Sequence, residues 1–110
     1  MVRWTREAEE DLREIVLYIR DHEAPGSARM MLTRLRERAA ALATAPQRGR
    51  WIPELDREFG VRAYREVVEG PWRIMYRIDD DQVLVIRVID GRRNVEDLLL
   101  RSLLRSRSGK

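Results

Sequence analysis

Between residues 64 and 93 the chain shows three short runs of β-branched and aromatic residues separated by two turn signals. The signals are Glu69-Gly70-Pro71 and Asp79-Asp80-Asp81, and such clusters are typical of the turns in a strand meander. The middle run alternates, and the positions on its apolar face are Trp72, Ile74, Tyr76 and Ile78. The third run, residues 83–89, is almost continuously apolar, as in a central strand covered on both faces. This stretch therefore predicts three strands of an antiparallel sheet.

Two earlier stretches show the spacing of amphipathic helices. Thr5 stands where an N-cap belongs, and the apolar stripe that follows consists of Ala8, Leu12, Ile15 and Ile19. Pro25-Gly26-Ser27 ends this helix, and Ser27 is the predicted cap of a second one. The stripe of the second helix consists of Ala28, Leu32, Leu35, Ala39 and Leu42. Two helices joined so closely predict an antiparallel hairpin.

The remaining segments complete the predicted order of elements. Residues 2–4 supply a short first strand, and residues 46–63 read as an irregular link. The apolar positions of a predicted last helix are Val95, Leu98, Leu99, Leu103 and Leu104. The order β-α-α-β-β-β-α predicts an α+β fold with the helical hairpin packed on one face of an antiparallel sheet. We predict one domain over residues 1–104 and a basic tail over residues 105–110.

Composition excludes several classes of site. The chain has 110 residues, enough for one modest core, and it has no cysteine for a disulfide, a thiolate nucleophile or a zinc site. The single histidine, His22, cannot form a metal site by itself and is expected to be a solvated residue at a helix end. We therefore predict neither a metal nor a cofactor. Because no apolar run has the length of a membrane span or a signal segment, a cytoplasmic location is expected.

The charge is distributed unevenly. The net charge is +3, yet the segment from Arg92 onward has six basic and two acidic residues, so residues 1–91 carry −1. This concentration predicts an acidic partner or a nucleic acid near the C-terminal end. For residues 105–110 a solvated tail that aids solubility is an equal alternative.

Five short motifs are familiar in this order. They are Trp4-Thr5 before an acidic helix, Pro46 to Arg50, Pro53-Glu54-Leu55, Gly70 to Arg77 and Arg87 to Arg93. Together they resemble the RelE/ParE superfamily of bacterial toxins, over residues 2 to about 95. The resemblance implies the toxin half of a type II toxin–antitoxin pair, with a cognate antitoxin as partner and a toxin–antitoxin hetero-oligomer as its complex.

The superfamily includes two competing activities. RelE-like members resemble a ribonuclease that cuts messenger RNA on the ribosome, whereas ParE-like members are associated with inhibition of DNA gyrase. For a nuclease, the resemblance implies Arg73, Arg93 and Glu54 as the catalytic candidates. Cleavage also needs a proton donor, and a guanidinium stays protonated at neutral pH.

The proton donor is the weak point of the nuclease interpretation. Where the RelE pattern would place a tyrosine, this chain has Leu98 and Leu99. Tyr64 and Tyr76 are the possible acids, but Tyr76 shares a strand face with core residues. The sequence therefore favours a ParE-like gyrase inhibitor that acts by protein–protein binding. The alternatives are a RelE-like ribosome-dependent mRNA interferase and a plain nucleic-acid-binding module, which would use aromatic residues as a stacking platform.

Two groups of residues are predicted to bind proteins. The target-binding candidates are Arg73, Arg92, Arg93 and Arg101. The antitoxin-binding candidates are Val16, Leu17, Tyr18 and Met30, which would line a groove for an amphipathic antitoxin helix. Several of these candidates have a structural alternative. Arg73 can pair with Glu66, and Glu54, the catalytic candidate, can tether the link to an arginine of the sheet. The exposed apolar residues can be ordinary surface residues, since single exposed apolar residues are normal.

Overall fold

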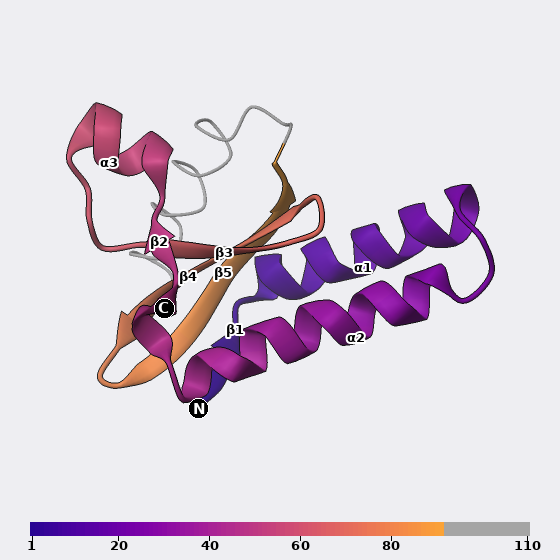
Figure 1. Cartoon of the computed structure of the whole chain (residues 1–110), viewed down its shortest axis with the longest axis horizontal. Coiled ribbons are helices and arrows are strands. Elements are labelled where there is room, and N and C mark those ends of the chain that lie inside the picture. Colours follow the sequence, from indigo (N-terminus) through magenta and orange to yellow (C-terminus); the bar gives the residue numbers. More distant parts are fainter. Residues whose placement is uncertain (92–110) are drawn as a thin grey trace.

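The computed structural model describes residues 1–91 of the chain (Figure 1). Its strands are β1 (Val2–Trp4), β2 (Arg50–Trp51), β3 (Arg65–Glu69), β4 (Trp72–Asp79) and β5 (Gln82–Asp90). Its helices are α1 (Arg6–His22), α2 (Ser27–Ala40) and α3 (Pro53–Phe59), with two 3-10 turns, η1 (Ala41–Ala43) and η2 (Pro46–Arg48). The predicted last helix and the tail from residue 105 lie outside the described residues.

The five strands form one mixed sheet with the order β1-β5-β4-β3-β2. As predicted, β3, β4 and β5 are an antiparallel meander. The prediction of a wholly antiparallel sheet was wrong, because β1 pairs with β5 in parallel, with Val2 opposite Val83. A run of three residues has no pattern that reveals strand direction. Only the path of the chain through α1 and α2 decides it.

A β-bulge shifts the alternation of β5. Tyr76 pairs with Val85 and Met75 pairs with Arg87, so Ile86 is an extra residue in β5. Beyond such a bulge the side chains change faces. The backbone N–H of Thr5 donates to the carbonyl of Val85, and its hydroxyl donates to the carbonyl of Ile86, both at 3.0 Å. The residue that caps α1 therefore also binds the bulge.

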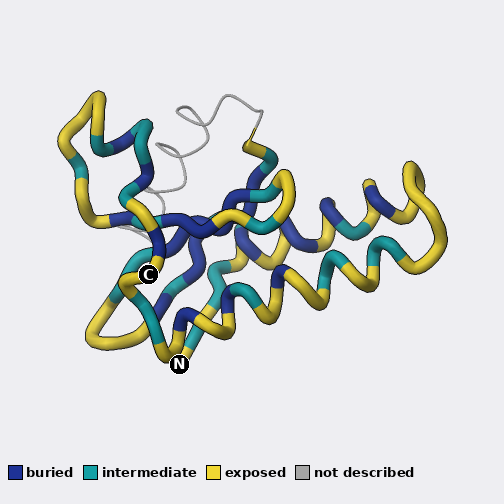
Figure 2. Tube along the Cα trace, in the orientation of Figure 1, coloured by how far each residue is buried: buried dark blue, intermediate teal, exposed yellow. Residues whose placement is uncertain are grey.

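Apolar residues cover both faces of the sheet. Figure 2 shows buried positions along the strands and at intervals along α1 and α2. The α1–α2 hairpin covers one face, and its contacts with the sheet form a buried cluster whose strand members are Val67, Ile74, Tyr76, Val83, Val85 and Val88. A second cluster on the opposite face consists of Ile52, Leu55, Tyr64, Met75, Ile86 and Ile89. The bulge explains why Val85 and Val88, three residues apart, belong to the same cluster.

The helix α3 was not predicted, because residues 46–63 were expected to be irregular. It has only seven residues and one buried apolar side chain, Leu55, which is too little for a recognisable helical period. Pro53 at its first position and Gly60 beyond its end, with φ of 65°, define it instead. A smaller correction concerns α2, where Gly26 with φ of 89° is the N-cap and Ser27 is the first helical residue.

None of the helices within residues 1–91 is long and apolar enough to cross a membrane.

Candidate functional site: a buried ion network and a pocket beside α1

Arg73 lies on the sheet face opposite the helical hairpin, between two carboxylates. Its Nε donates to Oε1 of Glu66 at 2.7 Å. Its two terminal nitrogens donate to the two carboxylate oxygens of Glu54, at 2.8 and 2.7 Å. The Arg73 side chain is only 9% exposed and that of Glu66 is fully buried. The two structural alternatives foreseen for these residues, an Arg73–Glu66 pair and a tether through Glu54, are both confirmed.

The network extends to the surface through Arg50, which binds Oε2 of Glu66 at 2.7 Å and is itself 62% exposed. The four side chains contribute two positive and two negative charges, so the network is neutral. The hydrogen bonds from Arg73 lower the pKa of Glu54, and those from Glu54 and Glu66 raise the pKa of Arg73. A general base works best with a pKa near the operating pH. Glu54 is therefore held as a carboxylate whose oxygens are already bonded.

Tyr76 joins the sheet to the link and is fully buried, as its face predicted. Its hydroxyl donates to the carbonyl of Pro46 at 2.7 Å and accepts from the backbone N–H of Gly49 at 2.9 Å. Burial raises the pKa of Tyr76. A Cβ on Gly49 would lie 2.7 Å from the carbonyl oxygen of Glu66 and would also collide with the Tyr76 hydroxyl, which explains the glycine. The hydroxyl is therefore not available as a proton donor to a substrate.

Three of the four predicted antitoxin-binding residues are exposed, but the residues of α1 among the four do not form one face. Leu17, Tyr18 and Met30 are 41%, 52% and 57% exposed, and Val16 is half-buried. At 100° per residue Val16 and Tyr18 project about 160° apart around α1, on either side of Leu17. At the end of the helix His22 is exposed and stacks on Tyr18, with ring centroids 4.3 Å apart. Arg92, Arg93 and Arg101 lie outside the described residues.

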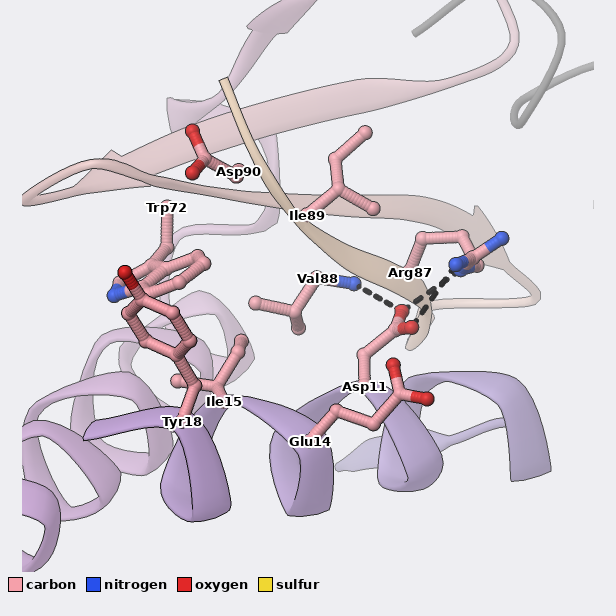
Figure 3. A pocket seen from close by; sticks show the side chains of 9 residues that line it. All are labelled: Asp11, Glu14, Ile15, Tyr18, Trp72, Arg87, Val88, Ile89 and Asp90. Atoms are coloured by element: carbon pink, nitrogen blue, oxygen red, sulfur yellow. Dashed lines mark hydrogen bonds and ion pairs between the residues drawn. The ribbon is translucent and has the colours of Figure 1, made fainter. Parts of the chain in front are cut away.

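A pocket of about 360 Å³ opens between α1 and the second half of β5 (Figure 3). Its lining residues are Asp11, Glu14, Ile15, Tyr18, Trp72, Arg87, Val88, Ile89 and Asp90. Asp11 is buried and accepts hydrogen bonds from Nε and Nη2 of Arg87, at 2.7 and 2.9 Å, and from the backbone N–H of Val88 at 2.8 Å. The hydrogen bond with Asp11 raises the pKa of Arg87.

Sequence reasoning missed this pocket, apart from Tyr18. One signal was present: Asp11 interrupts the apolar side of α1, and Arg87 interrupts an apolar strand. A buried carboxylate and a buried guanidinium require each other. Their pairing, however, connects residues 76 positions apart. Within residues 1–91, no group of three or more His, Asp or Glu side chains is placed to hold a metal ion.

Comparison with known proteins assigns the family. The model of the family described as "ParE toxin of type II toxin-antitoxin system, parDE" matches residues 2–95. A chain of the chromosomal ParDE TA system from P. aeruginosa has the same fold, with a TM-score of 0.66 and 20% identity over 81% of this chain and 92% of that chain.

A chain of the toxin–antitoxin complex RelBE2 from Mycobacterium tuberculosis is also similar, with a TM-score of 0.59 and 25% identity over 84% of this chain and 92% of that chain. A comparison with curated protein sequences finds no match. Because the family model covers nearly all of the residues that form the sheet and the hairpin, the chain belongs to the ParE toxin family of type II toxin–antitoxin systems.

Proposed function

We propose that this ParE-family toxin inhibits DNA gyrase by protein–protein binding and that a cognate antitoxin neutralises it. The observation that supports this choice over RNA cleavage is the state of Arg73. Its guanidinium makes three hydrogen bonds to Glu54 and Glu66 and is almost completely covered. To bind a phosphate it would have to leave two carboxylates, one of them fully buried. Breaking a buried ion pair in this way costs about 3–5 kcal/mol.

The other nuclease candidates among the described residues are also engaged in hydrogen bonds within the protein. Glu54 is bonded to Arg73, and the Tyr76 hydroxyl is bonded to Pro46 and Gly49. The aromatic side chains of β4 do not provide a stacking platform for bases, because Tyr76 is buried and Trp72 is partly covered. In our proposal the target contacts of the toxin come from the arginines after β5, namely Arg92, Arg93 and Arg101. Arg73 contributes to target binding only if the target breaks its hydrogen bonds to Glu54 and Glu66.

Two assays with the purified toxin test this proposal. We expect the toxin to block supercoiling by gyrase and to leave messenger RNA intact in a cell-free translation reaction. Arg93→Ala should weaken gyrase inhibition, whereas Arg34→Ala should not, because Arg34 is an exposed arginine of α2 that is not among the proposed target contacts. Cleaved mRNA together with normal supercoiling would replace our proposal with a RelE-like mRNA interferase.

The antitoxin is proposed to cover the exposed apolar residues Leu17, Tyr18 and Met30, with Val16 at the margin. Full burial of one such side chain contributes about 1.5–3 kcal/mol, so Leu17→Glu should weaken antitoxin binding at least about tenfold. Phe59→Glu is the matched control, since Phe59 is 52% exposed but lies at the end of α3 on the other face of the sheet. Equal loss of affinity in both variants would show that the antitoxin binds elsewhere or that charge alone causes the effect.

A further inference from the structure

The pocket beside α1 has two chemically different ends (Figure 3). The rings of Tyr18 and Trp72 line one end, and Asp11, Glu14 and Arg87 line the other. Between them Ile15 and Val88 form an apolar floor. The volume of about 360 Å³ is near the lower limit of ligand pockets, which measure roughly 300–1,000 Å³. The pocket therefore suits a single long side chain rather than a nucleotide-sized molecule.

The charges of the lining residues favour a cationic occupant. At the charged end two carboxylates, those of Asp11 and Glu14, line the pocket beside one guanidinium, that of Arg87. Asp11 and Arg87 bind each other through two hydrogen bonds. Glu14 is exposed and makes no hydrogen bond within residues 1–91, and its charge acts on the guanidinium of Arg87 through space. A carboxylate next to an apolar channel is complementary to a side chain with a long methylene stem and a charged head, as in lysine and arginine.

The position of Tyr18 connects this pocket with the antitoxin surface. Tyr18 belongs to the exposed apolar residues of α1 and also lines the aromatic end of the pocket. A segment that covers Leu17 and Tyr18 therefore passes the opening next to the rings. From there the stem of a basic side chain can lie along Ile15 and Val88, and its head reaches Glu14.

We propose that this pocket receives a basic side chain of the antitoxin and that Glu14 is the carboxylate that binds its charged head. This inference rests on the proposed neutralisation by an antitoxin, but it adds the chemistry of the contact. It predicts that the antitoxin segment over α1 combines apolar residues with one arginine or lysine at the pocket. A bidentate bond between a guanidinium and a carboxylate would give such a contact its specificity.

The first experiment examines the pocket without the antitoxin. The purified toxin is titrated with Nα-acetyl-arginine amide and, in parallel, with Nα-acetyl-citrulline amide, which has nearly the same shape but no charge. Binding is followed by NMR through the indole resonance of Trp72, whose N–H has no acceptor among the described residues and is buried. We expect a saturable shift with the arginine compound and at least about a fivefold weaker effect with citrulline. Equal shifts with both compounds, or none with either, would refute a cation site.

The second experiment uses the complex with the antitoxin. Glu14→Gln should raise the dissociation constant of the antitoxin about tenfold, or 1.4 kcal/mol. Glu10→Gln is the matched control: Glu10 lies on the same helix, is exposed and does not line the pocket. Glu10→Gln should change the dissociation constant less than twofold. This control measures the effect of removing one negative charge from α1 outside the pocket. An equal effect of the two substitutions, or tighter binding by Glu14→Gln, would refute the proposed contact.

The two experiments separate the pocket from the proposed function. If the antitoxin binds tightly and Glu14→Gln behaves like Glu10→Gln, the contact is wrong while neutralisation stands. If no antitoxin binds but the arginine compound still shifts the Trp72 resonance, the pocket is a cation site and the proposed neutralisation is wrong.

Discussion

The substitution Arg73→Met measures the contribution of the buried ion network most directly. Methionine retains an apolar stem against Gly91, where the Cδ of Arg73 lies 3.2 Å from the position of a Cβ. It removes one hydrogen bond to Glu66 and two to Glu54. Glu54 is 27% exposed and can be hydrated, but Glu66 is fully buried. Glu66 then depends on Arg50 alone.

The expected loss of stability follows from that burial. Removing one partner of a buried pair costs about 3–5 kcal/mol because the remaining charge stays in a medium of low dielectric constant. Arg50 continues to bind Glu66, so we expect the lower end, about 3 kcal/mol. Small domains have a free energy of unfolding of about 5–15 kcal/mol in total. The variant should therefore fold but unfold at a clearly lower urea concentration.

The assay is urea unfolding at neutral pH, followed by tryptophan fluorescence. Arg62→Met is the control, since Arg62 pairs with Asp56 in the same part of the chain but is 66% exposed, and such surface pairs contribute about 0–1 kcal/mol. Adding Glu66→Gln to Arg73→Met should recover part of the loss, because it removes the unpaired charge. If Arg73→Met costs no more than Arg62→Met, or the two substitutions in the network are simply additive, our account of the network is wrong.

Three further predictions concern single residues. Hydrogen bonds from Arg73 lower the pKa of Glu54 from its ordinary value of 4.5. The ionised carboxylate of Glu54 therefore stabilises the fold at neutral pH, and this stabilisation is lost as the pH falls through the lowered pKa. In urea titrations, the difference in stability between wild type and Glu54→Gln should shrink from about pH 6 to pH 3. Gly49→Ala should lower the free energy of unfolding by about 1–3 kcal/mol, because the added Cβ overpacks the site. Combining it with Tyr76→Phe should relieve part of that cost. An unchanged melting temperature of Gly49→Ala would contradict the close contact of Gly49 with Tyr76 and Glu66. Asp11→Asn should cost about 2–3 kcal/mol, since it weakens the bonds to Arg87 in a mostly buried site, and an unchanged melting temperature would show that this pair is dispensable.

Local patterns predicted the parts of this fold that depend on local sequence. The apolar spacing of Leu12, Ile15 and Ile19 is enough to define a helix, and the alternation in residues 72–78 is enough to define a strand. Alternation also placed Arg73 opposite the core, which allowed its pairing with Glu66 to be considered. The exposure of Leu17 and Met30 followed in the same way from their position on each helix.

The remaining features depend on contacts between distant segments. The bulge at Ile86 adds one residue to β5 and is not visible in a run of apolar residues. The direction of β1 is decided by the path of the chain, and α3 is held by a single buried leucine, Leu55. The pocket beside α1 brings together Asp11 and Arg87, which lie 76 positions apart in the chain. Each of these features is set by tertiary packing rather than by the preference of the local segment.

The bonds of Thr5 also set the order in which the fold can be completed during synthesis. Thr5 caps α1 through Ala8 and binds the carbonyl of Ile86, which lies 81 positions later in the chain. Contacts over such distances form late, because the whole intervening segment must first be ordered. A growing chain can form its helical hairpin early, but β1 has no partner until β5 has left the ribosome. The complete sheet therefore forms only after residues 82–90 have been synthesised.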